Sequence, residues 1–334
     1  MKPLTVGLLG GGSWGTTVAA LLSRNAQVTL WARNPDTVRE INQQHTNETY
    51  LPGARLPERL LASSDIAATA ASADVLVVGV PSQNFRAVLE DAREHIRPWV
   101  PVISLTKGLE LDTRLRMTEI INEVLPGHPV GVLTGPNLAR EIMAGQAAAT
   151  VLAMQDAIIL GELQGLFSSG LFRVYTNTDV IGCELGGVLK NIIAIAVGMG
   201  DGMGAGDNTR AALITRGLAE ITRLGVAMGG QAETFAGLAG MGDMIATCTS
   251  PQSRNRHVGM ELGRGRTLEE ISAEMYMVAE GAKSAPAVLA LAEAHGVEMP
   301  MTSDVYRVLT GETTAQRIFR GLLRVSAGAE SEPG

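Results

Sequence analysis

The chain has 334 residues, of which 46% are hydrophobic and 18% are charged, and its formal net charge is −7 at pH 7. This length predicts about two domains, and the composition is ordinary for a globular protein with a large core. The negative charge argues against non-specific nucleic-acid binding, which needs a basic surface, but it permits a local site for an anion. The sequence shows neither an uninterrupted apolar run of about 18 residues nor a signal-peptide pattern, so we expect a soluble cytoplasmic protein without a membrane span.

The cysteines and histidines argue against a disulfide-stabilised protein and against a metalloprotein. Cys183 and Cys248 are too few for a disulfide framework or a metal cluster, and we expect both to be buried in a protein of a reducing compartment. The five histidines are scattered without metal-ligand spacing, so no metal is expected.

The first stretch of the chain carries a nucleotide-binding pattern. An apolar strand over Leu4–Leu9 leads into a glycine turn with G-x-G-x-x-G at Gly10, Gly12 and Gly15, and a helix follows over Thr16–Leu22. Gly10 allows the tight turn, Gly12 allows a pyrophosphate to approach the backbone, and Gly15 allows the helix to pack closely on the strand. The helix N-terminus then receives the anion. The alternative, a purely structural turn, fits this context less well.

The end of the second strand bears on the choice of cofactor. A strand over Val28–Trp31 is followed by Arg33, and the nearest acidic residue is Asp36. An acid at this position would bind the ribose 2′-OH of NAD, whereas an arginine can stack on adenine and pair with a 2′-phosphate. Arg33 therefore favours NADPH, although a solvated strand-end arginine is the alternative and NADH stays open.

Strands and helices alternate up to about residue 176. After Trp31, residues 36–64 predict one helix and then a loop. Strands are expected at 74–82, 101–105, 130–133, 148–153 and 172–176, and helices at 85–95, 115–125, 138–144 and 156–167. This order predicts an α/β fold, with a Rossmann-type doubly wound parallel sheet and extra terminal strands.

The second half of the chain lacks strand patterns and predicts an all-α domain. Helices are expected at 187–198 and 209–228, and the glycine-rich stretches at 198–206 and 237–242 are predicted loops. The expected organisation is a dinucleotide-binding domain at 1–178, a helical substrate-binding domain at 179–325 and a disordered tail at 326–334.

Polar residues that follow the strands are candidates for the site. Lys107 comes just after one strand, and Gly135 and Asn137 come just after the next. Ligands of open α/β sheets bind at the carboxyl ends of the strands, so these residues are expected to face the cofactor crevice. A solvated Lys107 is the alternative.

Two stretches of the helical half could supply a substrate site. Lys190 stands in an apolar helical run, and a part-buried lysine can act as an acid or base, although a lysine that reaches from a core helix into solvent is the alternative. Ser253, Arg254 and Asn255 combine a hydroxyl, a guanidinium and an amide, which suit phosphate oxygens, whereas a solvated polar loop would need none of them. Asp243 could hold a substrate hydroxyl or orient Lys190.

Seven stretches together closely resemble the bacterial NAD(P)-dependent glycerol-3-phosphate dehydrogenases. They occur in the family's order at 10–16, 105–110, 133–137, 184–192, 237–243, 253–256 and 278–281. The resemblance implies reversible reduction of dihydroxyacetone phosphate to sn-glycerol 3-phosphate with NADP or NAD as cofactor, and a role in phospholipid synthesis. Asn137 departs from the family, which more often has Ser or Thr there, and Ala279 stands where Val is common.

The resemblance also implies residue roles. Lys190 would be the general acid/base, and it would share the substrate with Lys107, Gly135, Asn137, Asp243, Ser253, Arg254 and Asn255. The cofactor would contact Ser13, Trp14, Arg33, Lys107, Ala139, Arg254, Val278 and Glu280, in addition to the glycine turn. Two other functions are alternatives: a dehydrogenase for another small anion, and a non-catalytic NAD(P)-binding sensor. The helical domain could also form the face of a homodimer.

Overall fold

The computed structural model describes residues 4–275 and 279–322, and the chain divides into two compact units, Met1–Val180 and Ile181–Gly334. The predicted cofactor residue Val278 and the predicted tail at 326–334 lie outside the described residues.

The first unit is built on one eight-stranded sheet, with strand order β3-β2-β1-β4-β5-β6-β7-β8. Neighbouring strands are parallel except β6 and β7, which are antiparallel. The order reverses between β1 and β4, so this sheet is the predicted doubly wound one, with β7 and β8 as the extra strands. The strands are β1 (Thr5–Leu9), β2 (Gln27–Trp31), β3 (Leu61–Ser63), β4 (Val75–Val78), β5 (Val102–Ser104), β6 (Val130–Thr134), β7 (Ala148–Met154) and β8 (Phe172–Asn177).

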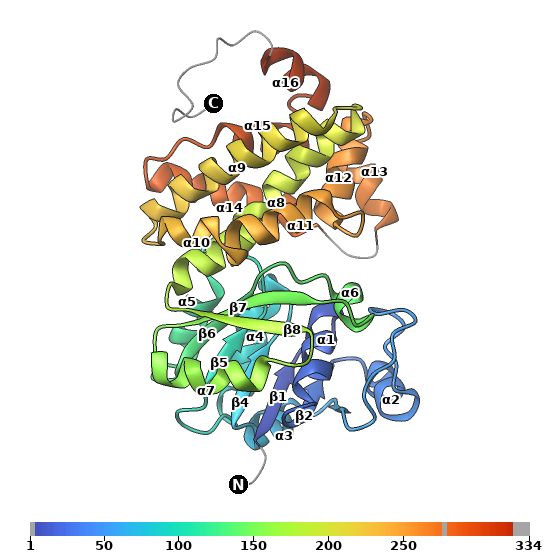
Figure 1. Cartoon of the computed structure of the whole chain (residues 1–334), viewed down its shortest axis with the longest axis vertical. Coiled ribbons are helices and arrows are strands. Elements are labelled where there is room, and N and C mark those ends of the chain that lie inside the picture. Colours follow the sequence, from blue (N-terminus) through green and yellow to red (C-terminus); the bar gives the residue numbers. More distant parts are fainter. Residues whose placement is uncertain (1–3, 276–278, 323–334) are drawn as a thin grey trace. The chain divides into compact units, whose positions relative to one another are not determined.

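Helices cover both faces of this sheet (Figure 1). Alternation along β4 shows the two layers, because Val75 and Val77 belong to one apolar cluster whereas Leu76 and Val78 belong to the other. The first cluster includes side chains of α1 (Ser13–Leu22), α2 (Pro35–Gln44), α6 (Ala139–Met143) and α7 (Ala157–Phe167). The second includes side chains of α3 (Ile66–Ser72), α4 (Ser82–Arg93) and α5 (Met117–Val124).

Two details of the first unit differ from the prediction. Strand β3 lies inside the stretch predicted as helix and loop, because three residues at a sheet edge are too short to show a two-residue period. Strand β4 ends at Val78 rather than at Ser82, and Pro81 is the residue that precedes helix α4. Proline is compatible with that position because it donates no backbone N–H.

The second unit is all-α within residues 181–275 and 279–322, as the sequence predicts. Its elements are α8 (Val180–Gly202), α9 (Asp207–Ala227), α10 (Ala232–Ala236), the π-helix η1 (Leu238–Gly242), α11 (Asp243–Thr249), α12 (Arg254–Gly263), α13 (Leu268–Glu274), α14 (Glu280–Ala294), α15 (Pro300–Leu309) and α16 (Ala315–Leu322).

The predicted loop at 198–206 is wrong in its first part, because helix α8 continues to Gly202, and the connection to α9 is formed by residues 203–206. Gly198 and Gly202 are packing positions: a Cβ on Gly198 would lie 2.2 Å from the Arg256 carbonyl oxygen. A Cβ on Gly259 of α12 would in turn lie 2.1 Å from the Ile195 carbonyl oxygen of α8. The two helices therefore touch through their backbones along a glycine seam formed by Gly198 and Gly202 of α8 and Gly259 and Gly263 of α12.

The predicted loop at 237–242 is also wrong, because most of it forms the π-helix η1, which leads directly into α11. Its glycines allow close packing: a Cβ on Gly240 would lie 2.2 Å from the Phe235 carbonyl oxygen, and one on Gly186 of α8 would lie 2.7 Å from that of Ala239. Asp243 is thereby fixed at the start of α11.

Helix α8 is long and apolar enough to cross a membrane by length and composition, with a mean hydropathy of 1.8 in its most apolar window. However, 94% of that window is buried inside the protein, as in the core helix of a soluble protein. In the second unit α8 lies beside α12 and α9 (Figure 1). It packs against α12 through the glycine seam and against α9 where Ile193 lies over Gly217.

Candidate functional site

The glycine turn between β1 and α1 has the geometry of a phosphate-binding loop. Gly10 has a φ of 128°, and a Cβ there would lie 2.6 Å from the Gly79 carbonyl oxygen. A Cβ on Gly15 would lie 2.1 Å from the Gly10 carbonyl oxygen, so strand and helix touch at this point. By contrast, no heavy atom of the described chain lies within 4 Å of a Cβ built on Gly12. Gly12 therefore leaves open the space that a pyrophosphate would need.

Helix α1 presents a free N-terminus to that space. Gly12 is its N-cap, and within the described residues no side chain caps the helix and no acidic residue occupies its first turn. The N–H groups and the positive dipole end are thus available to an anion, which fits a dinucleotide. Trp14 packs in this turn against Phe172, with ring centroids 6.3 Å apart.

Arg33 is exposed just beyond the end of β2. The neighbouring Asn34 caps helix α2, since its Oδ1 accepts a hydrogen bond of 2.9 Å from the Asp36 N–H. The Asp36 carboxylate pairs with Arg39 on the same helix. The nearest acid after β2 therefore has a partner at the start of α2, and Arg33 is the charged residue closest to the strand end.

Three predicted residues meet where β5 and β6 end. Lys107 Nζ donates a hydrogen bond of 2.9 Å to the Gly135 carbonyl oxygen. Asn137 Nδ2 donates one of 2.9 Å to Thr150 Oγ1, which in turn donates to the Thr134 carbonyl oxygen at 2.8 Å. Sequence reasoning missed Thr150, which is fully buried on the antiparallel strand β7. Ala139 is the first residue of the short helix α6.

In the second unit Lys190 is buried and paired. Its Nζ lies 2.6 Å from Asp243 Oδ1 of α11 and donates a further hydrogen bond to Thr247 Oγ1. The Thr247 hydroxyl donates to the backbone carbonyl of Asp243 at 2.7 Å. The Asp243 carboxylate is the counter-charge of the buried Lys190 ammonium. Asp243 therefore contacts Lys190, and its two predicted roles, orienting Lys190 or holding a substrate hydroxyl, stay predictions.

Thr247 was missed by sequence reasoning, although its spacing of four residues from Asp243 puts both on one face of α11. The next residue, Cys248, is fully buried, and this burial raises the pKa of its thiol to about 12. A buried thiol with a raised pKa is inert at neutral pH.

A second chain of hydrogen bonds joins three helices. Asn255 Nδ2 donates to Asn191 Oδ1 at 3.0 Å, and Asn255 Oδ1 accepts from the Gly281 N–H at 3.0 Å. Asn255 therefore links α12 to Asn191, the neighbour of Lys190, and to the start of α14 beside Glu280. Asn191 is a further residue that the sequence analysis did not single out.

The N-terminus of α12 is held by a side-chain cap and by ion pairs with residues that are not among the predicted site residues. Ser253 is its N-cap and accepts a hydrogen bond of 3.2 Å from the Arg256 N–H, and Arg254 follows as the first helical residue. Arg256 Nε lies 2.7 Å from Asp201 of α8, and Arg210 of α9 binds the same carboxylate at 2.8 Å. Asp201 thereby holds α12 on its neighbours.

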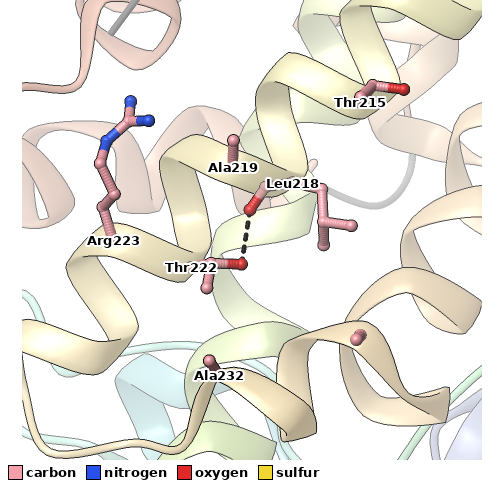
Figure 2. A pocket seen from close by; sticks show the side chains of 7 residues that line it. Thr215, Leu218, Ala219, Thr222, Arg223 and Ala232 are labelled. Atoms are coloured by element: carbon pink, nitrogen blue, oxygen red, sulfur yellow. Dashed lines mark hydrogen bonds between the residues drawn. The ribbon is translucent and has the colours of Figure 1, made fainter. Parts of the chain in front are cut away.

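A pocket of about 430 Å³ lies elsewhere on the second unit, between α9 and α10 (Figure 2). Its wall is mostly apolar, with Leu218, Ala219 and Ala232 among the lining residues, and Thr222 binds the Leu218 carbonyl of its own helix. The predicted site residues are not part of this wall.

The doubly wound sheet with its open glycine turn, and the helical unit with its buried lysine–carboxylate pair, together define a dinucleotide-dependent dehydrogenase with a helical second domain. Comparisons with known proteins narrow this class. Residues 5–159 match the model of the N-terminus of NAD-dependent glycerol-3-phosphate dehydrogenase, and residues 179–320 match that of its C-terminus. The chain belongs to this family, as its seven motifs indicate.

Individual relatives agree over nearly the whole chain. A glycerol-3-phosphate dehydrogenase [NAD(P)+] of Sphingopyxis alaskensis is 71% identical over 331 residues, which are 99% of each chain. One from Mycobacterium tuberculosis is 51% identical and covers 97% of this chain and 95% of its own. The crystal structure of glycerol-3-phosphate dehydrogenase from Coxiella burnetii has a TM-score of 0.91 at 39% identity, and covers 97% of this chain and 99% of its own.

Proposed function

We propose that this enzyme reversibly reduces dihydroxyacetone phosphate to sn-glycerol 3-phosphate with NADPH or NADH, and that it supplies phospholipid synthesis in the cytoplasm. The observation that carries the proposal is the buried Lys190–Asp243 pair, in a chain whose relatives are named for this reaction.

Lys190 acts as the general acid in the direction of reduction. Its ammonium polarises the ketone and gives a proton to the carbonyl oxygen. The nicotinamide cofactor, when bound, would supply the hydride. One hydride and one proton convert the ketone to the secondary alcohol, so the step is balanced. In the reverse direction the neutral amine accepts the hydroxyl proton.

The phosphate of the substrate binds Ser253, Arg254 and Asn255. A guanidinium beside a hydroxyl and an amide supplies several charge-assisted hydrogen bonds, and this remote binding energy orients the ketone for reaction. Lys107, Gly135 and Asn137 contact the remainder of the substrate. Asp243 acts through Lys190, and Thr247 joins it in holding the ammonium.

The cofactor binds the first unit, from residue 1 to about 178, and the helical unit from 179 holds the substrate. The glycine turn would hold the pyrophosphate of the cofactor, and Arg33 would accommodate its adenosine end, which favours NADPH. Further cofactor contacts that the family resemblance implies come from Ser13, Trp14, Lys107, Ala139, Arg254 and Glu280, whereas Val278 lies outside the described residues. The oligomeric state is a separate question, with a monomer and a homodimer formed through the helical domain as the alternatives. Light scattering at assay concentration distinguishes them by molar mass.

The test is oxidation of NADPH and of NADH by the purified enzyme with dihydroxyacetone phosphate, followed by the absorbance of the reduced nicotinamide. The Lys190→Ala variant is expected to bind NADPH normally and to lose about a hundredfold or more in turnover. Lys283→Ala removes an exposed lysine from α14 and serves as the matched control. Near-normal turnover of Lys190→Ala would refute the lysine's role, and inactivity of the wild type with both cofactors would refute the function. An analogue with carboxylate in place of phosphate should be rejected, which distinguishes a hydroxy-acid dehydrogenase.

A further inference from the structure

The glycine turn needs a constraint that its own residues cannot supply. Gly10, Gly11 and Gly12 are consecutive, and glycine has the largest backbone freedom to lose on folding. Backbone groups hold the two outer residues: the Gly10 N–H donates to the Trp31 carbonyl at 3.0 Å, and the Gly12 carbonyl accepts from the Thr16 N–H at 2.9 Å. The peptide between Gly11 and Gly12 is held differently.

Asn47 provides that contact. Its Nδ2 donates to the Gly11 carbonyl oxygen at 3.0 Å and to Thr16 Oγ1 at 2.9 Å. Both amide hydrogens are thus used on the turn and on the first part of helix α1. Asn47 is fully buried, and its Oδ1 has no hydrogen-bond partner within the described chain. A buried acceptor without a partner is costly, so the two donated bonds are the interactions that favour asparagine here.

The segment that carries Asn47 is itself fixed. The Asn47 carbonyl accepts hydrogen bonds from the Tyr50 and Leu51 N–H groups at 3.2 and 2.7 Å. Glu40 of α2 accepts from the Thr46 hydroxyl and from the Glu48 N–H, on either side of Asn47. The asparagine side chain is therefore presented to the turn by a rigid support.

We propose that Asn47 is a positioning residue for the dinucleotide. A trans peptide is planar, with its carbonyl and its N–H pointing in opposite directions. By binding the Gly11 carbonyl, Asn47 therefore also sets the direction of the Gly12 N–H, at the open end of α1 where the pyrophosphate binds. Without this bond the glycine peptide can rotate, and the N–H is no longer preorganised for the anion. This inference rests on the dinucleotide binding of the proposed function.

The experiment measures the Kd of NADPH by calorimetry, and the KM of each substrate, for full-length variants. Asn47→Ala should raise the Kd and KM of NADPH about tenfold or more, while the KM of dihydroxyacetone phosphate changes less than about twofold. Asn47→Asp keeps the size but removes the donors and faces the Gly11 carbonyl with a carboxylate, so its loss should be larger. Asn42→Ala is the matched control, because Asn42 makes two hydrogen bonds to Ala62 on β3, away from the turn, at 2.9 and 2.8 Å.

The split between the two substrates separates positioning from stability. If Asn47 only stabilised the fold, Asn47→Ala and Asn42→Ala would both lower Tm and both would bind NADPH as the wild type does, which overturns the proposal. If Asn47→Ala does not fold, Asn47→Asp takes its place, because it keeps the size but removes the donor to the Gly11 carbonyl, and an unchanged Kd for NADPH in that variant overturns the proposal. A wild type that binds neither NADPH nor NADH refutes the proposed function itself, whereas normal wild-type binding with an unaffected Asn47→Ala refutes the role of Asn47 alone.

Discussion

Replacing Asp243 alone by leucine would leave the Lys190 ammonium buried without its counter-charge. The two side chains are 3% and 6% exposed, and their charged atoms are 2.6 Å apart. Replacing Lys190 alone by methionine would strand the carboxylate in the same way. The double variant, Lys190→Met with Asp243→Leu, removes both charges and keeps apolar side chains of similar volume.

The magnitude follows from the distance and the burial. At an effective dielectric constant of about 20, charges 2.6 Å apart attract by roughly 6 kcal/mol. Desolvation of both groups offsets most of this attraction, so the intact pair contributes little, whereas either single substitution costs about 3–5 kcal/mol. For a unit of this size that loss lowers Tm by about 6–20 °C. The double variant should recover most of it, because its interior holds no unpaired charge.

The assay is urea unfolding of the wild type, the two single variants and the double variant, with Tm as a second measurement. Because every variant disrupts the pair that contains the proposed general acid Lys190, activity is not the readout. The coupling free energy of the double-mutant cycle should be favourable by about 3 kcal/mol or more. If the double variant were as unstable as the sum of the two single variants, the pair would not be coupled and the reasoning would fail.

Two further predictions concern the helical unit. Gly259→Ala would place a Cβ 2.1 Å from the Ile195 carbonyl oxygen and should cost about 1–3 kcal/mol in unfolding free energy. Gly161→Ala in α7 is the control and should be neutral or stabilising, because no described heavy atom lies within 4 Å of a Cβ built there. Equal Tm values for the two variants would contradict the tight packing of the glycine seam. Glu220 of α9 accepts hydrogen bonds from the Met301 N–H and from Thr302, and burial raises the pKa of its carboxyl above the ordinary 4.5. The contribution of Glu220 to the stability of the wild type is therefore complete below pH 4.5 and is lost as the pH rises through the raised pKa of the folded state. Glutamine does not titrate, so the Tm of Glu220→Gln relative to the wild type should increase between about pH 4.5 and pH 8. A difference in Tm that does not vary with pH would show that Glu220 does not titrate in this way.

Much of the fold could be predicted because its patterns are local. Buried parallel strands are continuous apolar runs, and the glycine turn shows both where β1 ends and where α1 begins. Glycines inside helices were misread because the sequence does not show what lies opposite them. Gly198 reads as a helix breaker until α12 is seen to approach it, and only packing between distant segments reveals that contact.

The candidate site, like the fold, has residues that the local sequence indicates and others that only contacts between distant segments reveal. Lys190 and Asp243 could be singled out from their own surroundings, but their pairing joins positions 53 residues apart. Asn47 and Thr150 gave no signal, because a buried asparagine or threonine in a loop or strand is common and acquires meaning from its partners. Residues whose role is to position other residues are therefore the ones that could not be identified from the sequence.

The glycine seam between α8 and α12 also limits how this enzyme can change. Lys190 stands on one of these helices and Asn255 on the other, and at the four glycines of the seam the two helices touch through their backbones. Side chains at a helix interface can be exchanged to slide or tilt the helices, but at the four glycines of the seam there is no side chain to exchange. Mutation can therefore alter the groups that meet a substrate more readily than the spacing between them, so new specificities on this scaffold should arise by replacing side chains on α11, α12 and α14.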